Sequence, residues 1–241
     1  MPLWSEWTRR VDALRPACAR TLTFLWLSVA LLSLCARGDL AGVTSWVRSG
    51  FLDGRAYRRL LHLFAGGGVR VEALTRCWVA LVLGPFRPVV VAGYRIAVTD
   101  GLKVPKEGRR MPGVKSLHQE SQNNSKPTYI MGHSFQAVGL LVEGGHGPLC
   151  VPLASRLHEG VKAGPGEAGT LLDKLVAFFL PLASDLRAPV LLLADAYYAS
   201  RKIILPLLAA GHHLVTRVRT NALAYRPVTP PAQLRRGRPR T

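Results

Sequence analysis

Acidic residues are scarce in this chain of 241 residues. There are 14 Asp and Glu against 32 Lys and Arg, which gives a formal net charge of +18. Genome bias explains a preference for Arg over Lys, but it explains the shortage of acids less well. Such an excess of cations favours a polyanionic partner, either a nucleic acid or an anionic membrane surface. The last acidic residue in the sequence is Asp195.

Cysteines and long apolar runs are also few. The four cysteines are widely spaced and form no Cys-x-x-Cys pair, which argues against a zinc or disulfide framework and favours a reducing compartment. The apolar run Leu22–Cys35 is shorter than the roughly 20 residues that a membrane span needs, and its charged leader is long for a signal peptide. We therefore expect a buried helix there and no membrane contact; a membrane-anchored basic protein is the alternative.

Residues 1–85 have the pattern of an all-helical N-terminal domain, and all five tryptophans lie in it. Apolar spacing predicts helices over residues 22–34, 39–49, 56–64 and 71–83. Several of these helices carry Arg on their polar faces, so the domain is either a DNA-binding bundle or a helical cap with solvated arginines. The Pro- and Gly-rich segment Gly84–Pro88 marks the expected domain boundary.

Residues 86–225 change to strand-like periodicity and predict a mixed α/β domain around one central sheet. We expect helices over 170–184 and 200–210, and strands over 89–98, 134–143, 149–153, 189–194 and 213–218. The remaining residues, 226–241, form a basic tail rich in Pro and Arg. Its segment 237–240, which includes Arg238, has the charge of a minor-groove DNA contact, although a plain basic linker fits equally well.

Two aspartates each close an apolar, strand-like run of this domain. Asp100 follows the first run and Asp195 follows the run at 189–194. Carboxylates at the ends of neighbouring strands hold the two divalent metals that cut or join a phosphodiester, and Mg²⁺ prefers oxygen ligands. We therefore interpret Asp100 and Asp195 as one metal site. Each has a structural alternative, because Asp100-Gly101 suits a tight hairpin turn and Asp195 suits the N-cap of the following helix.

A basic loop is expected over residues 103–126, directly after Asp100. Its cations are Lys103, Lys106, Arg109, Arg110, Lys115 and Lys126. Cationic and amide side chains together suit contacts with DNA phosphates and base edges, and a solvated surface loop is the alternative. His118 and His133 lie nearby in the sequence. We assign them no catalytic role, because a lone His more often packs or forms a structural hydrogen bond.

Three segments resemble the DDE transposases of bacterial insertion sequences. They are VTDGLKVPKEGRRMPGVKSLHQES at 98–121, LADAYYA at 193–199 and TRVRTNA at 216–222, and GVTSWVR at 42–48 extends the resemblance over most of the chain. The resemblance implies an α/β, ribonuclease-H-like core after the helical N-terminal domain. It also implies strand cleavage and transfer at terminal inverted repeats, with Mg²⁺ or Mn²⁺ in a two-metal site.

By this resemblance Asp100 and Asp195 would be the first and second catalytic aspartates and metal ligands. The expected partners are terminal inverted repeats, target DNA and other copies of the chain, and the expected location is the bacterial cytoplasm, at the nucleoid. The residues for which we predict DNA contacts are Lys103, Lys106, Arg109, Arg110, Lys115, Arg217, Arg219 and Arg238.

The chain departs from the family pattern at the third acid. In the family this acid is a glutamate on a helix after the last core strand, whereas no Asp or Glu follows Asp195 here. The expectation is therefore a C-terminally truncated transposase, from a frameshifted, degenerate or fragmentary gene, that has lost most activity. A basic module that binds DNA or RNA without a metal site is the alternative from another functional class.

Overall fold

The structure is a computed structural model that describes residues 2–39, 42–108, 111–118, 127–158 and 169–218. Its N-terminal part is helical. The elements are α1 (Leu3–Asp12), the short 3-10 helix η1 (Arg15–Ala17), α2 (Thr21–Ala36), α3 (Val43–Ser49), α4 (Arg55–Ala65) and α5 (Val71–Leu83). Each helix expected from apolar spacing forms here, with ends shifted by a few residues. No helix in the described ranges is both long and apolar enough to cross a membrane.

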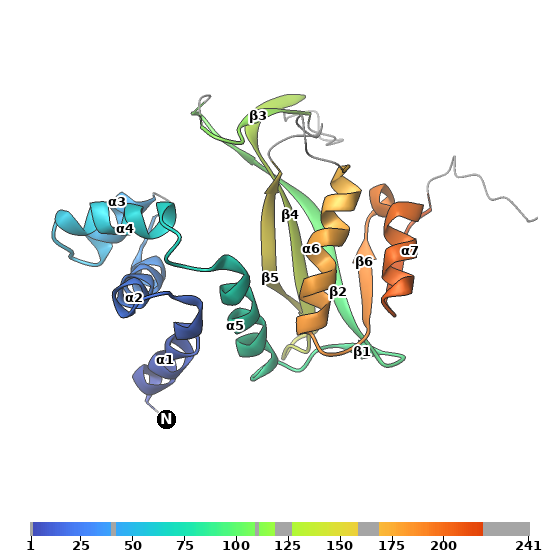
Figure 1. Ribbon diagram of the computed structural model, residues 1–241, viewed down its shortest axis with the longest axis horizontal. Helices are drawn as coiled ribbons and strands as arrows, with labels where there is room; N and C mark the ends of the chain where they lie inside the picture. The colour runs from blue at the N-terminus through green and yellow to red at the C-terminus, as the bar shows by residue number, and fades with distance from the viewer. Residues whose placement is uncertain (1, 40–41, 109–110, 119–126, 159–168, 219–241) are drawn as a thin grey trace, which may run out of the picture.

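A seven-stranded sheet forms the second part of the structure (Figure 1). Its strands are β1 (Val90–Val91), β2 (Tyr94–Pro105), β3 (Lys115–His118), β4 (Tyr129–Val142), β5 (Leu149–His158), β6 (Val190–Ala194) and β7 (His213–Thr216). Strand β4 pairs antiparallel with β3 and β5 on one side and with β2 on the other. Strands β6 and β7 then continue the sheet from β2 in parallel pairing, so β2 has an antiparallel neighbour, β4, on one side and a parallel neighbour, β6, on the other.

The first strand differs from the sequence expectation at both of its ends. The run predicted as one strand over 89–98 is broken after β1 by a tight turn at Ala92 and Gly93, which have φ angles of 50° and 83°. Strand β2 then continues past Asp100 to Pro105, because the long strand β4 pairs with it as far as Gly132. The hairpin-turn alternative for Asp100-Gly101 is therefore wrong, and Lys103 lies on a strand rather than in a loop.

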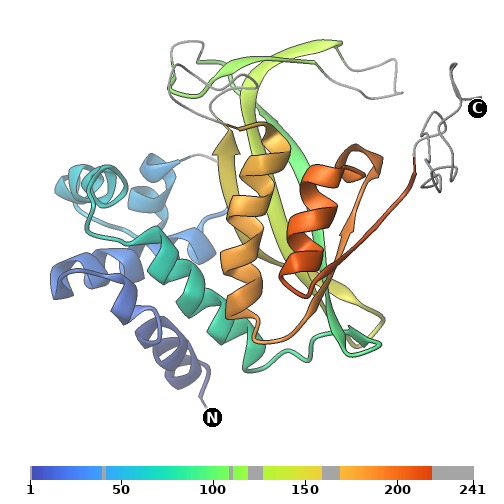
Figure 2. The same ribbon diagram turned by 45° about the vertical axis from the view of Figure 1, so that its right-hand side comes forward.

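The main hydrophobic core lies between the sheet and the helices α6 (Leu171–Asp185) and α7 (Arg201–Ala209). Figure 2 shows these two helices side by side against the sheet. Phe179 of α6 is fully buried against apolar side chains of β2, β4 and β6. Helix α6 begins at a capping box, in which the Thr170 side chain and Asp173 bind each other's backbone N–H groups.

Helix α5 joins this core to a second one. Val79 and Val82 are buried in the main core, whereas Leu74, Cys77 and Leu81 pack against the smaller core among the N-terminal helices. Two polar contacts hold α5 to β5: Trp78 Nε1 donates to the Pro152 carbonyl at 2.8 Å, and Arg156 lies 3.2 Å from Glu72. The boundary expected at residue 85 therefore directly follows α5, the helix that contacts both cores. Helices α1 to α4 lie on the side of α5 away from the sheet (Figure 1).

Removal of the Phe179 ring should reveal how much the main core contributes to stability. Phe179→Ala is expected to lower the free energy of unfolding by about 3–5 kcal/mol, because a fully buried ring leaves a cavity. Phe51→Ala is the matched control, since that side chain is 97% exposed and should change the value by less than about 0.5 kcal/mol. Urea denaturation of both variants measures the difference, and equal effects would contradict the assigned core.

The start of α6 should make stability depend on pH in the acid range. The hydrogen bond from Lys202, with those from Thr170, lowers the pKa of Asp173 from 3.8 to about 2. Because the folded pKa is the lower one, this stabilisation is present above pH 3.8 and is lost as the pH falls toward 2. Asp173→Asn should therefore flatten the acid limb of a stability–pH curve. Asp185→Asn, which removes the same charge at the other end of α6 and away from the capping box, is the matched control.

Candidate functional site

The pairing of β2 with β6 brings the two predicted metal ligands to the same level of the sheet. The parallel register runs from Arg95 opposite Val190 to Val98 opposite Leu193. Two residues further along each strand are Asp100 and Asp195. Because neighbouring strands lie about 4.8 Å apart, the two aspartates occupy adjacent positions where β6 ends.

Both aspartates line one cavity of about 460 Å³. The two carboxylates and Tyr197 lie on β2 and on the segment after β6. Strands β3, β4 and β5 of the same sheet also contribute to the lining. The lining residues on those three strands are Lys115, Ser116, Leu117, His118, Tyr129, Ser134, Phe135, Gln136 and His158. The sequence-predicted pair therefore faces a single hollow rather than two separate surfaces.

Each carboxylate is exposed and uses one oxygen for a local hydrogen bond. Oδ1 of Asp100 accepts from the Gly101 N–H at 2.7 Å, and Oδ1 of Asp195 accepts from the Tyr197 N–H at 3.0 Å. The second bond makes Asp195 the N-cap of the short 3-10 helix η2 (Ala196–Tyr198), so the expected capping role is present. Neither aspartate forms an ion pair with a residue that the structure describes.

This donor set fits a hard divalent cation, because it offers two carboxylates with one oxygen each not used by the local bonds. It is a small set. Within the described ranges, no three His, Cys, Asp or Glu side chains come together as a possible metal site. Asp100 and Asp195 are therefore the residues that could hold a metal here, and a complete coordination shell would need further oxygen ligands.

A buried hydrogen-bond network lies directly beneath the carboxylate pair. The Tyr198 hydroxyl donates to Oε1 of Gln136 at 3.0 Å. Nε2 of Gln136 donates to the Thr99 hydroxyl at 2.7 Å and to the Asp100 carbonyl at 3.0 Å, and Thr99 in turn donates to the Ala137 carbonyl. The network joins η2, β4 and β2, so it ties the backbone after Asp195 to the backbone at Asp100.

Tyr198 lies close enough to Asp100 and Asp195 for their negative charges to affect the pKa of its hydroxyl. Burial, together with the negative charges of Asp100 and Asp195, raises the pKa of Tyr198 to about 12, although the hydrogen bond to Gln136 acts in the opposite direction. The phenol therefore stays protonated throughout the physiological pH range. It can act as a hydrogen-bond donor that positions Gln136, but it cannot act as a base.

Two lysines also line this cavity, Lys103 on β2 and Lys115 on β3. Lys103 Nζ donates to the His118 carbonyl at 2.7 Å, and Lys115 Nζ donates to the His158 carbonyl at 3.2 Å. His158 is buried, and burial together with the charges of Lys115 and Lys174 lowers its pKa. Its Nε2 atom has no hydrogen-bond partner among the described residues. This part of the cavity can receive an anionic or hydrogen-bonding group.

The other predicted DNA contacts are distributed differently. Lys106 and Arg217 are described, but they do not line this cavity. Arg109, Arg110, Arg219 and Arg238, together with the 226–241 tail, lie outside the described residues. His133 is also absent from the cavity lining; it is largely buried, with Nε2 2.9 Å from the Pro112 carbonyl.

Sequence reasoning missed several residues that shape the site. Gln136 and His158 received no role, although Gln136 is a polar residue within a long apolar run, which is a recognisable signal. Tyr198 follows Asp195 by three positions and belongs to the segment that carried the family resemblance. The position of His158 in the cavity depends on pairing between β4 and β5, and no local sequence pattern predicts it.

Comparison with known proteins adds the following findings. A family model described as "DDE superfamily endonuclease" matches residues 14–241. Among solved structures, a cryo-EM structure of the piggyBac transposase synaptic complex with hairpin DNA matches with 14% sequence identity and a TM-score of 0.43. That match covers 83% of this chain and 44% of the piggyBac chain, so the chain spans less than half of its length. No curated protein matches.

Removal of the Tyr198 hydroxyl should destabilise the protein, because it breaks the hydrogen-bond network next to the two aspartates. Tyr198→Phe leaves the buried Oε1 of Gln136 without its donor, and it should lower the free energy of unfolding by about 1–3 kcal/mol. Tyr197→Phe is the control, because that adjacent side chain is 45% exposed. Urea denaturation measures both. In the parent protein, one tyrosine should ionise near pH 12 in a spectrophotometric titration, and Tyr198→Phe should remove that step.

Proposed function

Because this chain belongs to the DDE superfamily endonucleases, we propose that it acts on DNA strands at the site formed by Asp100 and Asp195. The observation that carries the proposal is the shared register of β2 and β6, which sets the two carboxylates side by side in one cavity. A polyanionic substrate also agrees with the net charge of +18.

Asp100 and Asp195 are the proposed ligands for Mg²⁺ or Mn²⁺. Bound divalent metal would activate an oxygen nucleophile and stabilise the leaving oxygen of a phosphodiester. The chain's own residues do the positioning. Gln136 and Tyr198 hold the backbone around both aspartates, while Lys103, Lys115 and His118, which line the same cavity, offer positive charge or hydrogen-bond donors to the phosphates of a bound strand.

The reaction that we propose is transposition-type strand cleavage and transfer at terminal inverted repeats of a bacterial insertion sequence, carried out at the nucleoid by self-associating copies. Its support is the family membership together with the resemblance of the segments around Asp100 and Asp195. We also propose a ribonuclease-H-like core. The strand order β5-β4-β2-β6-β7, in which β4 alone runs antiparallel to the other four strands, supports it.

The third acid of the proposed triad is not among residues 196–241, because no Asp or Glu follows Asp195. Two carboxylates supply fewer ligands than a two-metal site needs, so this chain alone should bind metal weakly and cleave DNA poorly.

Metal binding tests the proposed site directly. Asp100→Asn and Asp195→Asn should each weaken Mn²⁺ binding by more than about tenfold, since loss of even an outer partner of a ligand costs that much. Asp185→Asn is the control, because it removes an equal charge outside the cavity lining. Isothermal titration calorimetry measures the affinities. Unchanged Mn²⁺ affinity in both site variants would contradict the proposed metal site. It would favour the alternative, a basic nucleic-acid-binding module without metal.

Strand cleavage tests the completeness of the site separately. With supercoiled plasmid and either Mg²⁺ or Mn²⁺, the chain should give little or no nicked product. Robust nicking that Asp100→Ala abolishes would show that two aspartates suffice, which would overturn the proposed need for a third acid but keep the site. Robust nicking that survives Asp100→Ala and Asp195→Ala would place the chemistry elsewhere.

A further inference from the structure

His158, the last residue of β5, is a buried side chain at the edge of the carboxylate cavity. It is only 5% exposed, and it lines the same cavity as Asp100 and Asp195. Its Nε2 atom is buried and has no hydrogen-bond partner within the described ranges. A buried polar atom without a partner costs stability, because it has lost its bonds to water and gained none in return. Such an atom needs a physical reason, and a bound ligand is one.

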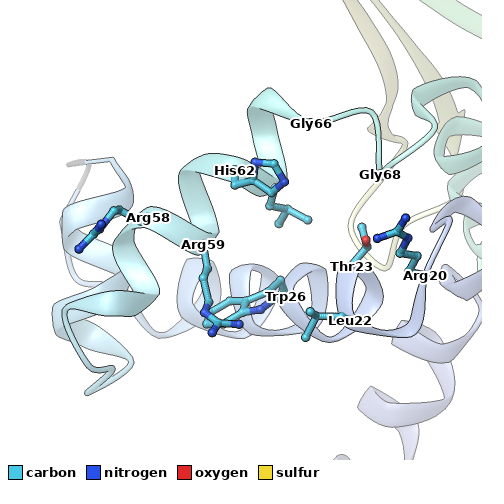
Figure 3. A pocket seen from close by; sticks show the side chains of 10 residues that line it. Arg20, Leu22, Thr23, Trp26, Arg58, Arg59, His62, Gly66 and Gly68 are labelled. Carbon is cyan, nitrogen blue, oxygen red and sulfur yellow. The ribbon is translucent and has the colours of Figure 1, made fainter.

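Comparison with two other histidines shows what is particular to His158. His133, on the neighbouring strand β4, is 9% exposed, but its Nε2 lies 2.9 Å from the Pro112 carbonyl and it does not line the cavity. His62 lines a different cavity, between α2 and α4, where its side chain is exposed to water (Figure 3). The buried histidine outside the carboxylate cavity therefore has a partner, whereas the one that borders the cavity has none among the residues that the structure describes.

The register of the sheet sets His158 in a row with two polar side chains. Ser134 of β4 lies opposite His158, and Lys103 of β2 lies opposite Ser134. Side chains that are directly opposite each other on antiparallel strands point to the same face of a sheet. Lys115 of β3 lies opposite Gly132, two positions from Ser134, so it points to that face as well. The two lysines, the serine and the histidine all line the cavity.

Positive charge lies close to the His158 ring. Lys115 Nζ donates to the His158 carbonyl at 3.2 Å, which holds the ammonium group next to this residue. Burial, and then the charges of Lys115 and Lys174, lower the pKa of His158. The ring is therefore neutral at pH 7 and carries one N–H group. Nearby positive charge favours an anion as the missing partner, and an anion accepts a hydrogen bond from Nε2 when that atom holds the proton.

A phosphate explains the unpartnered nitrogen better than a metal ion does. In the ranges that the structure describes, no three His, Cys, Asp or Glu side chains come together as a possible metal site, so His158 is not a third ligand beside the two aspartates. Lys103 and Lys115 each donate one ammonium N–H to a backbone carbonyl. Because an ammonium group has three such donors, both lysines keep donors for an anion in the same cavity.

We propose that His158 is a positioning residue, which donates a hydrogen bond from Nε2 to an oxygen of one DNA backbone phosphate beside the phosphate that reacts at Asp100 and Asp195. The assignment of this phosphate to DNA rests on the proposed function. Lys103 and Lys115 contribute charge to the same phosphate, while His158 contributes direction. Because Nε2 is covered in the structure, the contact forms as Lys115 turns from the His158 carbonyl toward the phosphate. His158 holds the strand and takes no proton from it.

Stability measurements are the first test. His158→Leu replaces the unpartnered ring by an apolar side chain, so the Tm should stay the same or rise. His133→Leu is the matched comparison, because it removes a buried histidine whose Nε2 has a partner, and it should lower the Tm by at least about 2–4 °C. Differential scanning calorimetry measures both. A drop for His158→Leu as large as that for His133→Leu would show a structural bond at His158 and overturn the proposal.

DNA affinity is the second test, measured by fluorescence anisotropy with a labelled DNA duplex in EDTA at about 0.1 M salt. His158→Leu should raise Kd roughly tenfold, since it removes one hydrogen bond to a charged group. His158→Gln, whose amide keeps an N–H donor, should recover most of that loss, and His133→Leu should bind like the parent protein. Equal Kd values for the parent protein and His158→Leu, or no recovery by His158→Gln, would overturn the proposal.

The salt dependence of DNA binding separates a neutral hydrogen bond from a charge. The slope of log K against log salt should be the same for His158→Leu as for the parent protein, because a neutral ring releases no counterion. Lys115→Gln should reduce that slope by about 0.9, the contribution of one neutralised phosphate. A reduced slope for His158→Leu would show that a charged imidazolium binds the phosphate, which contradicts a neutral donor.

Two controls distinguish this inference from the proposed metal site and from a site for free phosphate. His158→Leu should leave the Mn²⁺ affinity unchanged, and a loss of affinity would make His158 a ligand and contradict the positioning role. Inorganic phosphate alone, at millimolar concentration, should not raise the Tm of the parent protein. A rise that His158→Leu removes would identify a small-anion site and overturn the DNA assignment. If the Asp100→Asn and Asp195→Asn variants keep their Mn²⁺ affinity while His158→Leu weakens DNA binding, the metal site fails and the phosphate contact stands.

Discussion

The parallel pairing of β2 with β6 determines which side chains meet at the candidate site. Strand β2 lies between β4 and β6, and successive side chains of a strand point to opposite faces of the sheet. Thr99 is buried and bonded to Gln136, while Asp100 is exposed. A slip of one residue would bury a carboxylate and expose a hydroxyl. The Gln136 hydrogen bonds to β2, and the Tyr198 bond that reaches Gln136 from the segment after β6, oppose that slip.

The contacts of helix α5 connect the two hydrophobic cores of the structure. One side of α5 belongs to the core beneath the sheet, and the other side belongs to the core of α2 and α4. Apolar packing on both sides, with the Trp78 and Arg156 contacts to β5, makes α5 a bridge rather than a linker.

Local pattern predicts most elements, because apolar spacing and turn residues act over a few positions. Helix α6 and strand β6 form where periodicity indicates, and the apolar runs alone single out the two strand-associated aspartates as a pair. The path of β2 beyond Asp100 is not predicted. Its Asp-Gly dipeptide has local turn chemistry, but pairing with the long strand β4 overrides that preference. Gln136 and His158 reach the site through pairings between distant segments, which no single stretch of sequence encodes.

Because acidic residues are scarce in this chain, the ion pairs that each carboxylate forms, or does not form, are informative. Several described carboxylates are held by nearby cations: Glu6 by Arg9 and Arg10, Asp53 by Arg55, Glu72 by Arg156 and Asp173 by Lys202. Cations outnumber acids 32 to 14, so pairing is the expected fate of an exposed carboxylate. Asp100 and Asp195 are among the described carboxylates that form no ion pair, although Lys103 and Lys115 line the same cavity. These lysines bond instead to backbone carbonyls. That arrangement leaves both carboxylates free of ion pairs with described residues, and therefore able to attract a divalent cation within a strongly basic protein.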